Sequence, residues 1–326
     1  MKLPHRRQFF HLAAGAAALP AMSRTAGAQA YPTRPVRWVV GTVAGSSPDM
    51  FARLIGQWLS DRLGRPFVIE NRPGAGTNIA TELVVRAPPD GYTLLFITSA
   101  NSINATLYDK LNFNFVRDIV PVATFVRVPN VMEVNPSFPA KTVPEFIAYT
   151  KANPGKVNMA SAGNGTVSHV AGELFKMMSG INMVHVPYRG GPPALTDLIG
   201  GQVQVMFDNL ASSIEHIKAG RLRALAVTAP MRSEALPDIP TISEFLPGYE
   251  GSALFGLGVP KNTPAEIVDK LNNEINAALA NPKVKARLAE LGGMAFARSP
   301  ADFSKLIADE TDKWAKVVKF SGAKPE

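Results

Sequence analysis

The sequence VVGTVAGSSPDMF, residues 39–51, begins as an apolar run, breaks in the short stretch GSSPD, and continues with apolar residues at helical spacing. This pattern predicts a strand, a tight turn and a helix. Ser46 is expected to cap the helix, and Asp49 to answer it from the third helical position as in a capping box. Because the first N–H groups of a helix have no internal partner, such a turn can hold an anion without a lysine or arginine.

Two further stretches have the same form. Residues 161–166, SAGNGT, follow a predicted strand and place Thr166 as the cap of a helix that carries His169. Residues 98–102, TSANS, follow a buried strand and include Ser99 and Asn101. Each stretch alone is equally consistent with an ordinary capped helix start. Their presence in both halves of the chain favours contact with a ligand.

The order of elements indicates two α/β units. Residues 35–97 alternate as β-α-β-α-β, which predicts a mostly parallel sheet covered by helices. Residues 119–134 are extended without an intervening helix, as expected where a chain crosses to another lobe. A second α/β series fills residues 142–228, and the apolar piece 253–259 is predicted to return to the first lobe.

Three helices follow, each expected to begin with a capping side chain before a proline: Thr263, Asn281 and Ser299. We therefore predict an α/β protein of two domains joined by crossing strands, with a ligand cleft between them. Domain 1 comprises residues 31–128 and 252–326, and domain 2 comprises residues 129–251.

The first thirty residues have the composition of an export signal. They combine Arg6-Arg7 with a weakly apolar, small-residue stretch and end in Ala28-Gln29-Ala30, a typical cleavage site. We predict a twin-arginine-type signal peptide over residues 1–30, cleaved near Ala30, and a periplasmic protein that is soluble after cleavage. No later segment is long and apolar enough to span a bilayer.

Composition excludes several function classes. The leader holds four basic residues and no acidic ones, so its removal lowers the formal charge from +8 to +4. The remaining basic residues are scattered among acids, and nucleic acid is not an expected partner. The absence of cysteine excludes disulfides, thiolate metal sites and a cysteine nucleophile. The mature chain has three separated histidines, so no metal site is expected either.

Other chemistry has weak support. Residues 72–79, RPGAGTNI, resemble a dinucleotide-binding loop but have Ile79 where the third glycine belongs. Neither a G-x-x-x-x-G-K-[ST] nor a G-x-S-x-G motif occurs. One catalytic alternative stays open, a secreted serine-type hydrolase that uses Ser161 or Ser168 with His169.

Six stretches in order along the chain resemble the Bug (TctC-like) family, the periplasmic solute receptors of tripartite tricarboxylate transporters. They are Ala44-Gly45 with residues 49–53, and residues 71–76, 161–176, 186–192, 197–202 and 260–264. The resemblance covers essentially the whole mature chain. It implies a two-lobed periplasmic-binding-protein fold of type II-like architecture that closes on a small carboxylate. It implies no enzymatic activity and no cofactor, with membrane transporter subunits or a sensor as partners, and we expect a monomer.

The resemblance also suggests which residues contact the ligand. The first-lobe loop and the second-lobe loop of the family form two jaws, often acting through water, and Tyr188 and Asp208 are further candidates. Asp208 would suit a ligand ammonium or hydroxyl, and its alternative role is to cap the helix that follows. Together with the helix starts above, the predicted ligand-binding set is Ala44, Gly45, Ser46, Ser47, Asp49, Ser99, Asn101, Ser161, Gly163, Gly165, Thr166, His169, Tyr188 and Asp208.

This chain departs from the pattern of the family that it resembles within the opening stretch. Gly41 and Thr42 stand where the family has proline and an aromatic residue, and Ser46 stands for the second glycine. Loss of the aromatic ring is expected to enlarge or polarise the pocket, and Ser46 adds a hydroxyl. These three positions are the first candidates for ligand specificity.

Overall fold

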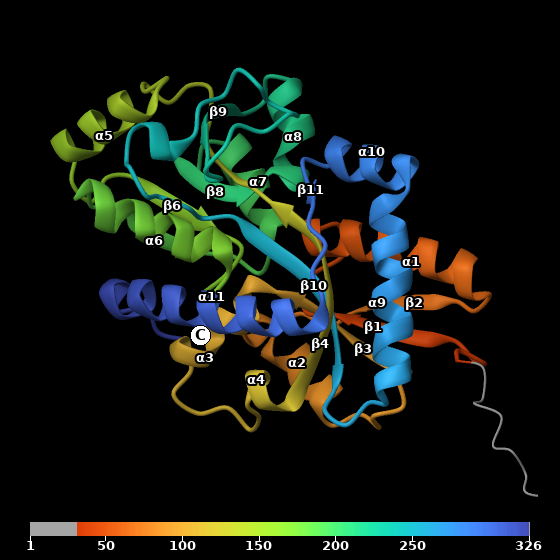
Figure 1. The fold of residues 1–326 in the computed structure, drawn as a ribbon. Coiled ribbons are helices and arrows are strands. Elements are labelled where there is room, and N and C mark those ends of the chain that lie inside the picture. The colour runs from red at the N-terminus through yellow and green to blue at the C-terminus, as the bar shows by residue number, and fades with distance from the viewer. Residues whose placement is uncertain (1–30, 326) are drawn as a thin grey trace, which may run out of the picture.

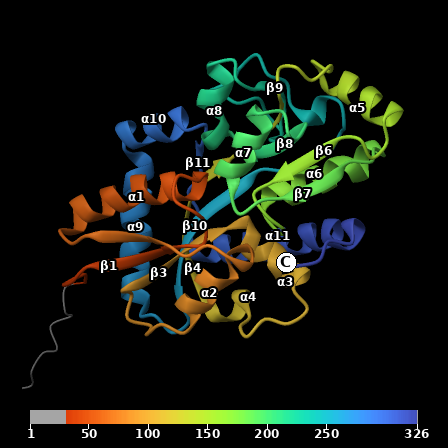
Figure 2. The same ribbon diagram turned by 180° about the vertical axis from the view of Figure 1, so that it is seen from behind.

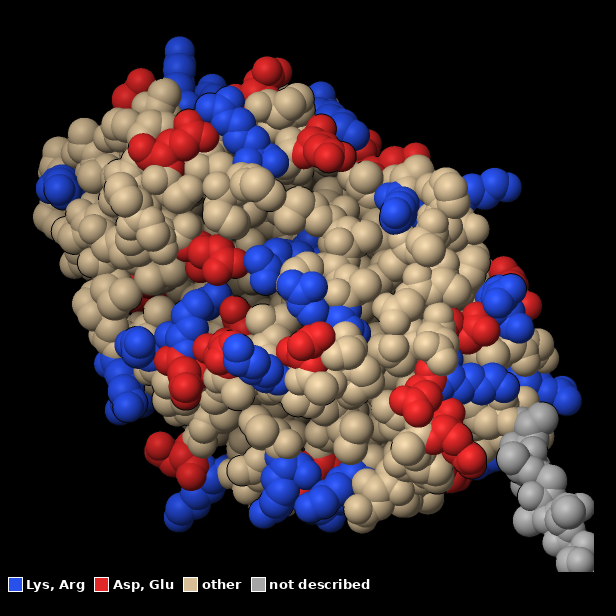
Figure 3. Space-filling model, viewed as in Figure 1, with Lys and Arg blue, Asp and Glu red and all other residues tan. Residues whose placement is uncertain are grey.

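The computed structural model describes residues 31–325, which form two lobes (Figure 1). The predicted signal peptide and its cleavage site near Ala30 lie outside the described residues. No helix in residues 31–325 has the length and apolarity needed to cross a membrane. On the face shown in Figure 3, basic and acidic side chains are interspersed over both lobes.

The first lobe is built on a six-stranded sheet with the order β11-β4-β10-β3-β1-β2. Strands β1, β2 and β3 run parallel, and β10 lies antiparallel between β3 and β4. The bounds are β1 Val36–Val40, β2 Phe67–Asn71, β3 Thr93–Thr98, β4 Ile119–Val128, β10 Ala253–Pro260 and β11 Met294–Ala295.

Alternating side chains of these strands are buried on both faces of the sheet, as expected for parallel strands covered by helices. Trp38 and Phe96 pack into the cluster that contains Phe51 of α1 and Leu271 of α9, whereas Val39 packs into a separate cluster with α2. The helices of this lobe are α1 Ser47–Leu63, α2 Asn78–Val85, α3 Ser99–Leu107, α4 Phe115–Asp118, α9 Ala265–Ala280, α10 Pro282–Glu290 and α11 Pro300–Ser321, with a 3-10 turn η1 Ala75–Thr77 before α2.

The second lobe has a five-stranded sheet with the order β7-β6-β8-β5-β9. Strand β6 runs parallel to β7 and β8, and β5 runs antiparallel to β8 and β9. The strands are β5 Asn130–Val134, β6 Asn158–Ser161, β7 Val184–Pro187, β8 Val205–Asn209 and β9 Arg223–Val227. The helices are α5 Val143–Ala152, α6 Val167–Ser179, α7 Gly191–Ile199 and α8 Leu210–Lys218, with a 3-10 turn η2 Ile242–Glu244.

Two crossings connect the lobes. Strand β4 of the first sheet is followed after a single residue by β5 of the second, and the chain returns from β9 to β10 (Figure 1). The two crossings lie side by side, because the Asn130 N–H donates to Thr228 Oγ1 (2.8 Å) and the Thr228 N–H donates to the Asn130 carbonyl (2.8 Å). Helix α11 packs against α3 of the first lobe and α6 of the second (Figure 2). The predicted fold class, two α/β lobes joined by crossing strands, is confirmed.

Several local predictions need correction. Ser46 precedes α1, but its hydroxyl donates to the Val43 carbonyl (2.7 Å) and does not cap the helix. The Asp49 carboxylate accepts from the Gly45 N–H (2.9 Å) and not from that of Ser46, so no capping box forms.

The predictions for the other helix starts are correct in some cases and wrong in others. Thr263 does not cap α9, because its hydroxyl donates to the Pro260 carbonyl (2.7 Å). Asn281 and Ser299 cap their helices as predicted. Residues 98–102 contain no turn, since β3 ends at Thr98 and α3 begins at Ser99.

Candidate functional site

A cavity of about 470 Å³ lies between the lobes. Its first-lobe wall comes from the segments that follow β1, β2 and β3, and its second-lobe wall from those that follow β6, β7 and β8. Ala253 and Phe255 of the crossing strand β10 complete it. The cavity therefore occupies the carboxyl ends of the parallel strands of both sheets, where α/β proteins commonly bind ligands.

Helix N-termini of both lobes border this cavity, and three of them carry a hydroxyl group of interest. Ser47 is the first residue of α1, Thr77 precedes α2, and Ser168 lies in the first turn of α6. All three line the cavity, and each has a buried hydroxyl oxygen without a hydrogen-bond partner. A buried polar atom without a partner is costly, and a helix N-terminus favours negative charge. The arrangement therefore suits an anion that accepts hydrogen bonds from both lobes.

The first-lobe loop is held by a buried carboxylate. Asp49 accepts from the Gly45 N–H (2.9 Å), from Arg53 Nε and Nη2 (3.0 and 2.9 Å) and from Asn71 Nδ2 (3.0 Å). Burial acts to raise the pKa of Asp49, but the hydrogen bonds from Arg53, Gly45 and Asn71 outweigh it and hold the pKa below its usual value. Asp49 thus fixes the loop from behind and does not line the cavity.

The three positions where this chain departs from its family all line the cavity. The Thr42 and Ser46 hydroxyls lie 2.8 Å apart and are hydrogen-bonded to each other. A Cβ on Gly41 would lie only 2.6 Å from Thr77 Cβ, so a side chain at position 41 would displace Thr77. Thr77 itself has a φ of +80°, which is strained for a β-branched residue and is typical of functional sites.

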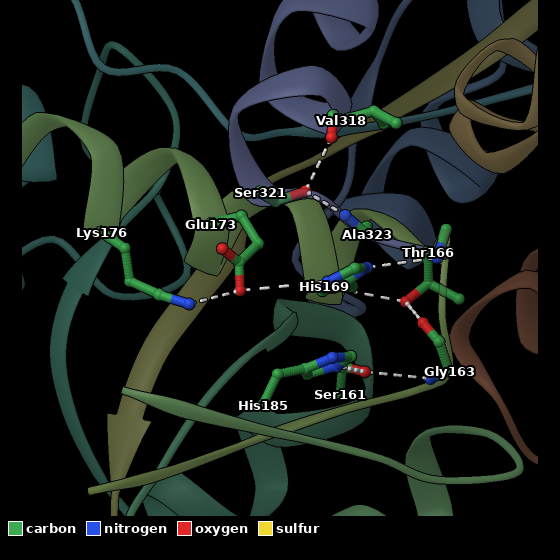
Figure 4. Close-up of polar contacts among 11 residues, drawn as sticks. Ser161, Gly163, Thr166, His169, Glu173, Lys176, His185, Val318, Ser321 and Ala323 are labelled. Carbon is green, nitrogen blue, oxygen red and sulfur yellow. Dashed lines mark hydrogen bonds and ion pairs between the residues drawn. The ribbon is translucent and has the colours of Figure 1, made fainter. Parts of the chain in front are cut away.

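The second-lobe loop is held by neutral groups (Figure 4). Thr166 accepts from the His169 N–H and so caps α6, as predicted. The Gly163 N–H donates to Ser161 Oγ (3.2 Å), which is hydrogen-bonded to His185 Nε2 (2.6 Å). The Gly165 N–H donates to His169 Nδ1 (3.3 Å).

The two histidine rings are stacked, with centroids 3.9 Å apart and planes inclined by 9°. Burial, then His185 and Lys176, lower the pKa of His169 to about 3. Burial, then Lys176, lower the pKa of His185 to about 4. Both imidazoles are therefore neutral at pH 7, which allows Nδ1 of His169 to accept the Gly165 N–H.

The residues of the hydrolase alternative are not arranged for catalysis. Ser161 pairs with His185 and not with His169, and it lies behind the loop, outside the cavity lining. Ser168 lines the cavity, but its hydroxyl has no hydrogen-bond partner. A serine nucleophile needs a base within hydrogen-bond reach, and neither predicted pair with His169 forms.

Of the predicted ligand-binding residues, six line the cavity: Ser46, Ser47, Gly163, Thr166, Tyr188 and Asp208. The remainder lie outside its lining: Ala44, Gly45, Asp49, Ser99, Asn101, Ser161, Gly165 and His169.

Ser99 and Asn101 have structural bonds. The Ser99 hydroxyl accepts from the Leu254 N–H (3.0 Å), and Asn101 accepts from the Thr98 N–H (2.8 Å) and donates to Thr81 Oγ1 (2.8 Å). Tyr188 lines the cavity, but its hydroxyl donates to Asp197 Oδ2 (2.7 Å), and burial and Asp197 raise its pKa to about 12.

Asp208, at the end of β8, does not cap α8. Its side chain is buried, it lines the cavity, and its Oδ2 has no hydrogen-bond partner.

Residues outside the predicted ligand-binding set also line the cavity, among them Thr77, Arg189 and Gly191. In the sequence, Thr77 stands out only as part of residues 72–79, which resemble an imperfect dinucleotide-binding loop.

The lobes touch each other beside the cavity. A Cβ on Gly190 would lie 2.7 Å from Val43 Cγ2, so only a glycine permits this approach of the second lobe to the first. A Cβ on Gly165 would likewise lie 2.6 Å from Asn104 Oδ1 of α3. The jaws are thus closed on each other. Among residues 31–325, no three histidine, aspartate or glutamate side chains group to hold a metal ion.

The fold and this site define a two-lobed solute-binding protein. The family described as "Tripartite tricarboxylate transporter family receptor" matches residues 51–322. Protein BugT of Bordetella pertussis is 36% identical over 300 residues, which cover 91% of this chain and 92% of BugT. A protein of Pseudomonas sp. (strain P51), from the tcbD-tcbE intergenic region, is 37% identical over 291 residues, which cover 89% of this chain and 87% of that protein.

Solved structures of similar receptors have the same fold as this chain. Rpa4515 of R. palustris, solved with adipate, superposes with a TM-score of 0.88 at 38% identity and covers 91% of this chain and 100% of its own. MatC from Rhodopseudomonas palustris, solved with bound malate, has a TM-score of 0.83 at 34% identity and covers 88% of this chain and 100% of its own. The chain belongs to the tripartite tricarboxylate transporter receptor family, whose members are periplasmic solute-binding receptors and not enzymes.

Proposed function

We propose that this protein captures a small carboxylate between its two lobes and presents it to a membrane transporter or a sensor. The observation that carries the proposal is the convergence of helix N-termini from both lobes on one cavity, three of them with a buried hydroxyl that has no hydrogen-bond partner: Ser47, Thr77 and Ser168. The adipate and malate bound by two similar receptors support the ligand class.

The energies are sufficient. A helix terminus contributes roughly 0.3–1 kcal/mol toward a bound anion, and each hydrogen bond to a charged group about 1.5–3 kcal/mol. A few such bonds reach the roughly 8 kcal/mol that corresponds to micromolar affinity. Binding therefore needs no lysine or arginine deep in the cavity.

The remaining predictions belong to the same proposal. Residues 31–128 and 252–326 act as one jaw and residues 129–251 as the other, and the crossings between them act as the hinge. Export to the periplasm rests on the signal-like residues 1–30. We expect the mature protein to act as a monomer.

Ligand-dependent stabilisation tests the function. A ligand present at one hundred times its dissociation constant should raise the free energy of unfolding by about 2.7 kcal/mol, with no turnover. Thermal unfolding is measured with a panel of mono-, di- and tricarboxylates. A panel in which no carboxylate raises the melting temperature would refute the proposal.

We also propose that Gly41, Thr42 and Ser46 set the ligand preference. Replacing Thr42 by an aromatic residue and Ser46 by glycine restores the family pattern at these two positions and breaks the hydroxyl pair between them. The double variant should change the ranking of the carboxylates in the same panel. An unchanged ranking would show that specificity lies elsewhere in the cavity.

A further inference from the structure

Asp208 is the buried acid that faces the cavity. Asp208 is only 4% exposed, and its Oδ2 atom has no hydrogen-bond partner. Burial raises the pKa of Asp208 to about 7, and the Asn209 N–H and the Ser213 hydroxyl offset that effect only in part. An acid in such a place needs either a proton or a donor from a ligand.

A second acid behind it does not compete for the ligand. Glu133 of β5 is fully buried, lies outside the cavity lining and accepts from the Ser213 hydroxyl (2.7 Å). Burial, and then the charge of Asp208, raise the pKa of Glu133 well above its usual value. Glu133 therefore stays neutral, and Asp208 is the acid of this pair that can accept a hydrogen bond from the ligand.

Glycine at position 191 leaves the carboxyl group of Asp208 open. Gly191 is the first residue of α7 and lines the cavity. A Cβ on Gly191 would lie 3.6 Å from both Asp208 oxygens. A side chain there would be in van der Waals contact with the carboxyl group and would take up cavity space beside it.

The cavity thus has two kinds of polar group. The helix N-termini with Ser47, Thr77 and Ser168 supply hydrogen-bond donors, as a carboxylate requires. Asp208 supplies an acceptor, which a ligand carboxylate cannot use but a hydroxyl or ammonium group can. A site with a buried polar group discriminates strongly against an analogue that leaves the group unpaired.

Resting on the proposed function, we propose that Asp208 accepts a hydrogen bond from a hydroxyl or ammonium substituent of the ligand. The protein is then selective for hydroxy- and amino-carboxylates over the unsubstituted acids. An ammonium group forms a charge-assisted bond with ionised Asp208 and gains more than a hydroxyl does.

Calorimetric titration at pH 7 with matched sets of acids tests this selectivity. Each set has one carbon frame without a substituent, with a hydroxyl and with an amino group: succinate, malate and aspartate; glutarate, 2-hydroxyglutarate and glutamate; adipate and its two derivatives. In the set that fits the cavity, at least one substituted acid should bind at least tenfold more tightly than its unsubstituted partner.

Two variants assign the selectivity to Asp208. Asp208→Asn keeps the shape but removes the charge, so the preference for the amino acid should fall at least tenfold. Gly191→Ala places a methyl group against the carboxyl group, which narrows the approach to it, and should lower the preference for both substituents at least threefold, while it leaves Asp208 itself in place. Glu215→Gln, an exposed acid on α8, is the matched control and should leave the preference unchanged.

The outcomes separate the two proposals. If unsubstituted acids bind as tightly as their substituted partners, or if both cavity variants keep the wild-type preference, Asp208 is not the selecting group, although the carboxylate function stands. If no acid of any set binds, the proposed function fails and the role of Asp208 fails with it.

Discussion

The two loops that face each other across the cavity have the same form but are fixed by different chemistry. In the first lobe, the loop before α1 is held by an ionised carboxylate, Asp49, which binds the Gly45 N–H and the guanidinium of Arg53. In the second lobe, the loop before α6 is held by neutral groups, because Ser161, His169 and His185 bind the N–H groups of the loop or each other.

The charged partners available to each loop explain this difference. Asp49 is covered, but the side chain of its partner Arg53 is 55% exposed, so the ion pair retains part of its hydration. His169 is as well covered as Asp49, and its nearest carboxylate, Glu173 at 4.0 Å, is paired with Lys176 (2.9 Å). A protonated imidazole would therefore lack a free partner, and burial keeps both histidines neutral. Both solutions leave one hydroxyl on each loop, Ser47 and Ser168, free to bind a ligand.

At neutral pH, the largest expected effect on stability comes from removing the ionised carboxylate that holds the first loop. Asp49→Ala leaves the Gly45 N–H and Asn71 Nδ2 without this acceptor, and we expect the free energy of unfolding to fall by about 2–3 kcal/mol. Chemical denaturation measures the change. Arg53→Ala is the matched control and should cost only about 0.5–1 kcal/mol, because the arginine is half-exposed. Equal losses for the two variants would mean that the ion pair, and not the loop N–H, carries the stability.

The second prediction tests the neutral support of the second-lobe loop through the pH dependence of the free energy of unfolding. The pKa of His185, about 4 in the folded protein, is below the value of about 6.5 expected when unfolded. As pH falls below 6.5 the unfolded chain takes up the proton first, so stability is lost toward pH 4, by up to about 1.4 kcal/mol per pH unit. His169 acts in the same direction.

Asp208 changes the pH dependence of stability in the direction opposite to the two histidines. Its pKa of about 7 is raised above that of the unfolded chain, so the folded state binds the proton first and gains stability as pH falls from 7 to 4. The histidine effect must therefore be measured as a difference between proteins. The unfolding free energy of His185→Gln should decrease less steeply than that of wild type between pH 6.5 and 4. His216→Gln, at a less buried histidine, is the control and should change the slope less. Parallel curves for wild type and His185→Gln would refute the neutral-support interpretation.

The comparison of the loops also shows what a sequence can predict. The strand, turn and helix order is encoded locally by apolar spacing and capping residues, and the two-lobed fold and the Thr166 cap were predicted correctly. The partner of Ser161 was not. His185 reaches Ser161 only because β7 runs parallel to β6, with Met159 opposite His185, and this register is a tertiary feature.

Thr77 was missed for a similar reason. Its position depends on four consecutive residues with positive φ, Gly74, Ala75, Gly76 and Thr77. Asn104 of α3 supports this turn by donating to the Gly76 carbonyl (2.5 Å) and to Asn78 Oδ1 (3.1 Å). No local pattern in residues 72–79 indicates a turn that a distant helix holds in place. The capping box at Ser46 failed because Gly45 and Asn71 compete for the Asp49 carboxylate.

The smallest effect on stability is expected where the two loops are alike. Ser47→Ala and Ser168→Ala each remove a buried hydroxyl that has no partner, so the free energy of unfolding should change by less than about 0.5 kcal/mol, or rise slightly. The affinity for the carboxylate should nevertheless fall about tenfold for each, which corresponds to about 1.4 kcal/mol for one hydrogen bond to a charged group.

Ser60→Ala, also on α1, is the matched control, because its hydroxyl donates to the Gly56 carbonyl (2.7 Å) and it lies outside the cavity lining. It should lower stability more than Ser47→Ala does and affinity less. Denaturation and ligand titration of the three variants give both numbers. If Ser47→Ala and Ser168→Ala destabilise the protein and leave affinity unchanged, the hydroxyls serve the fold, and the two loops do not act as paired jaws on one anion.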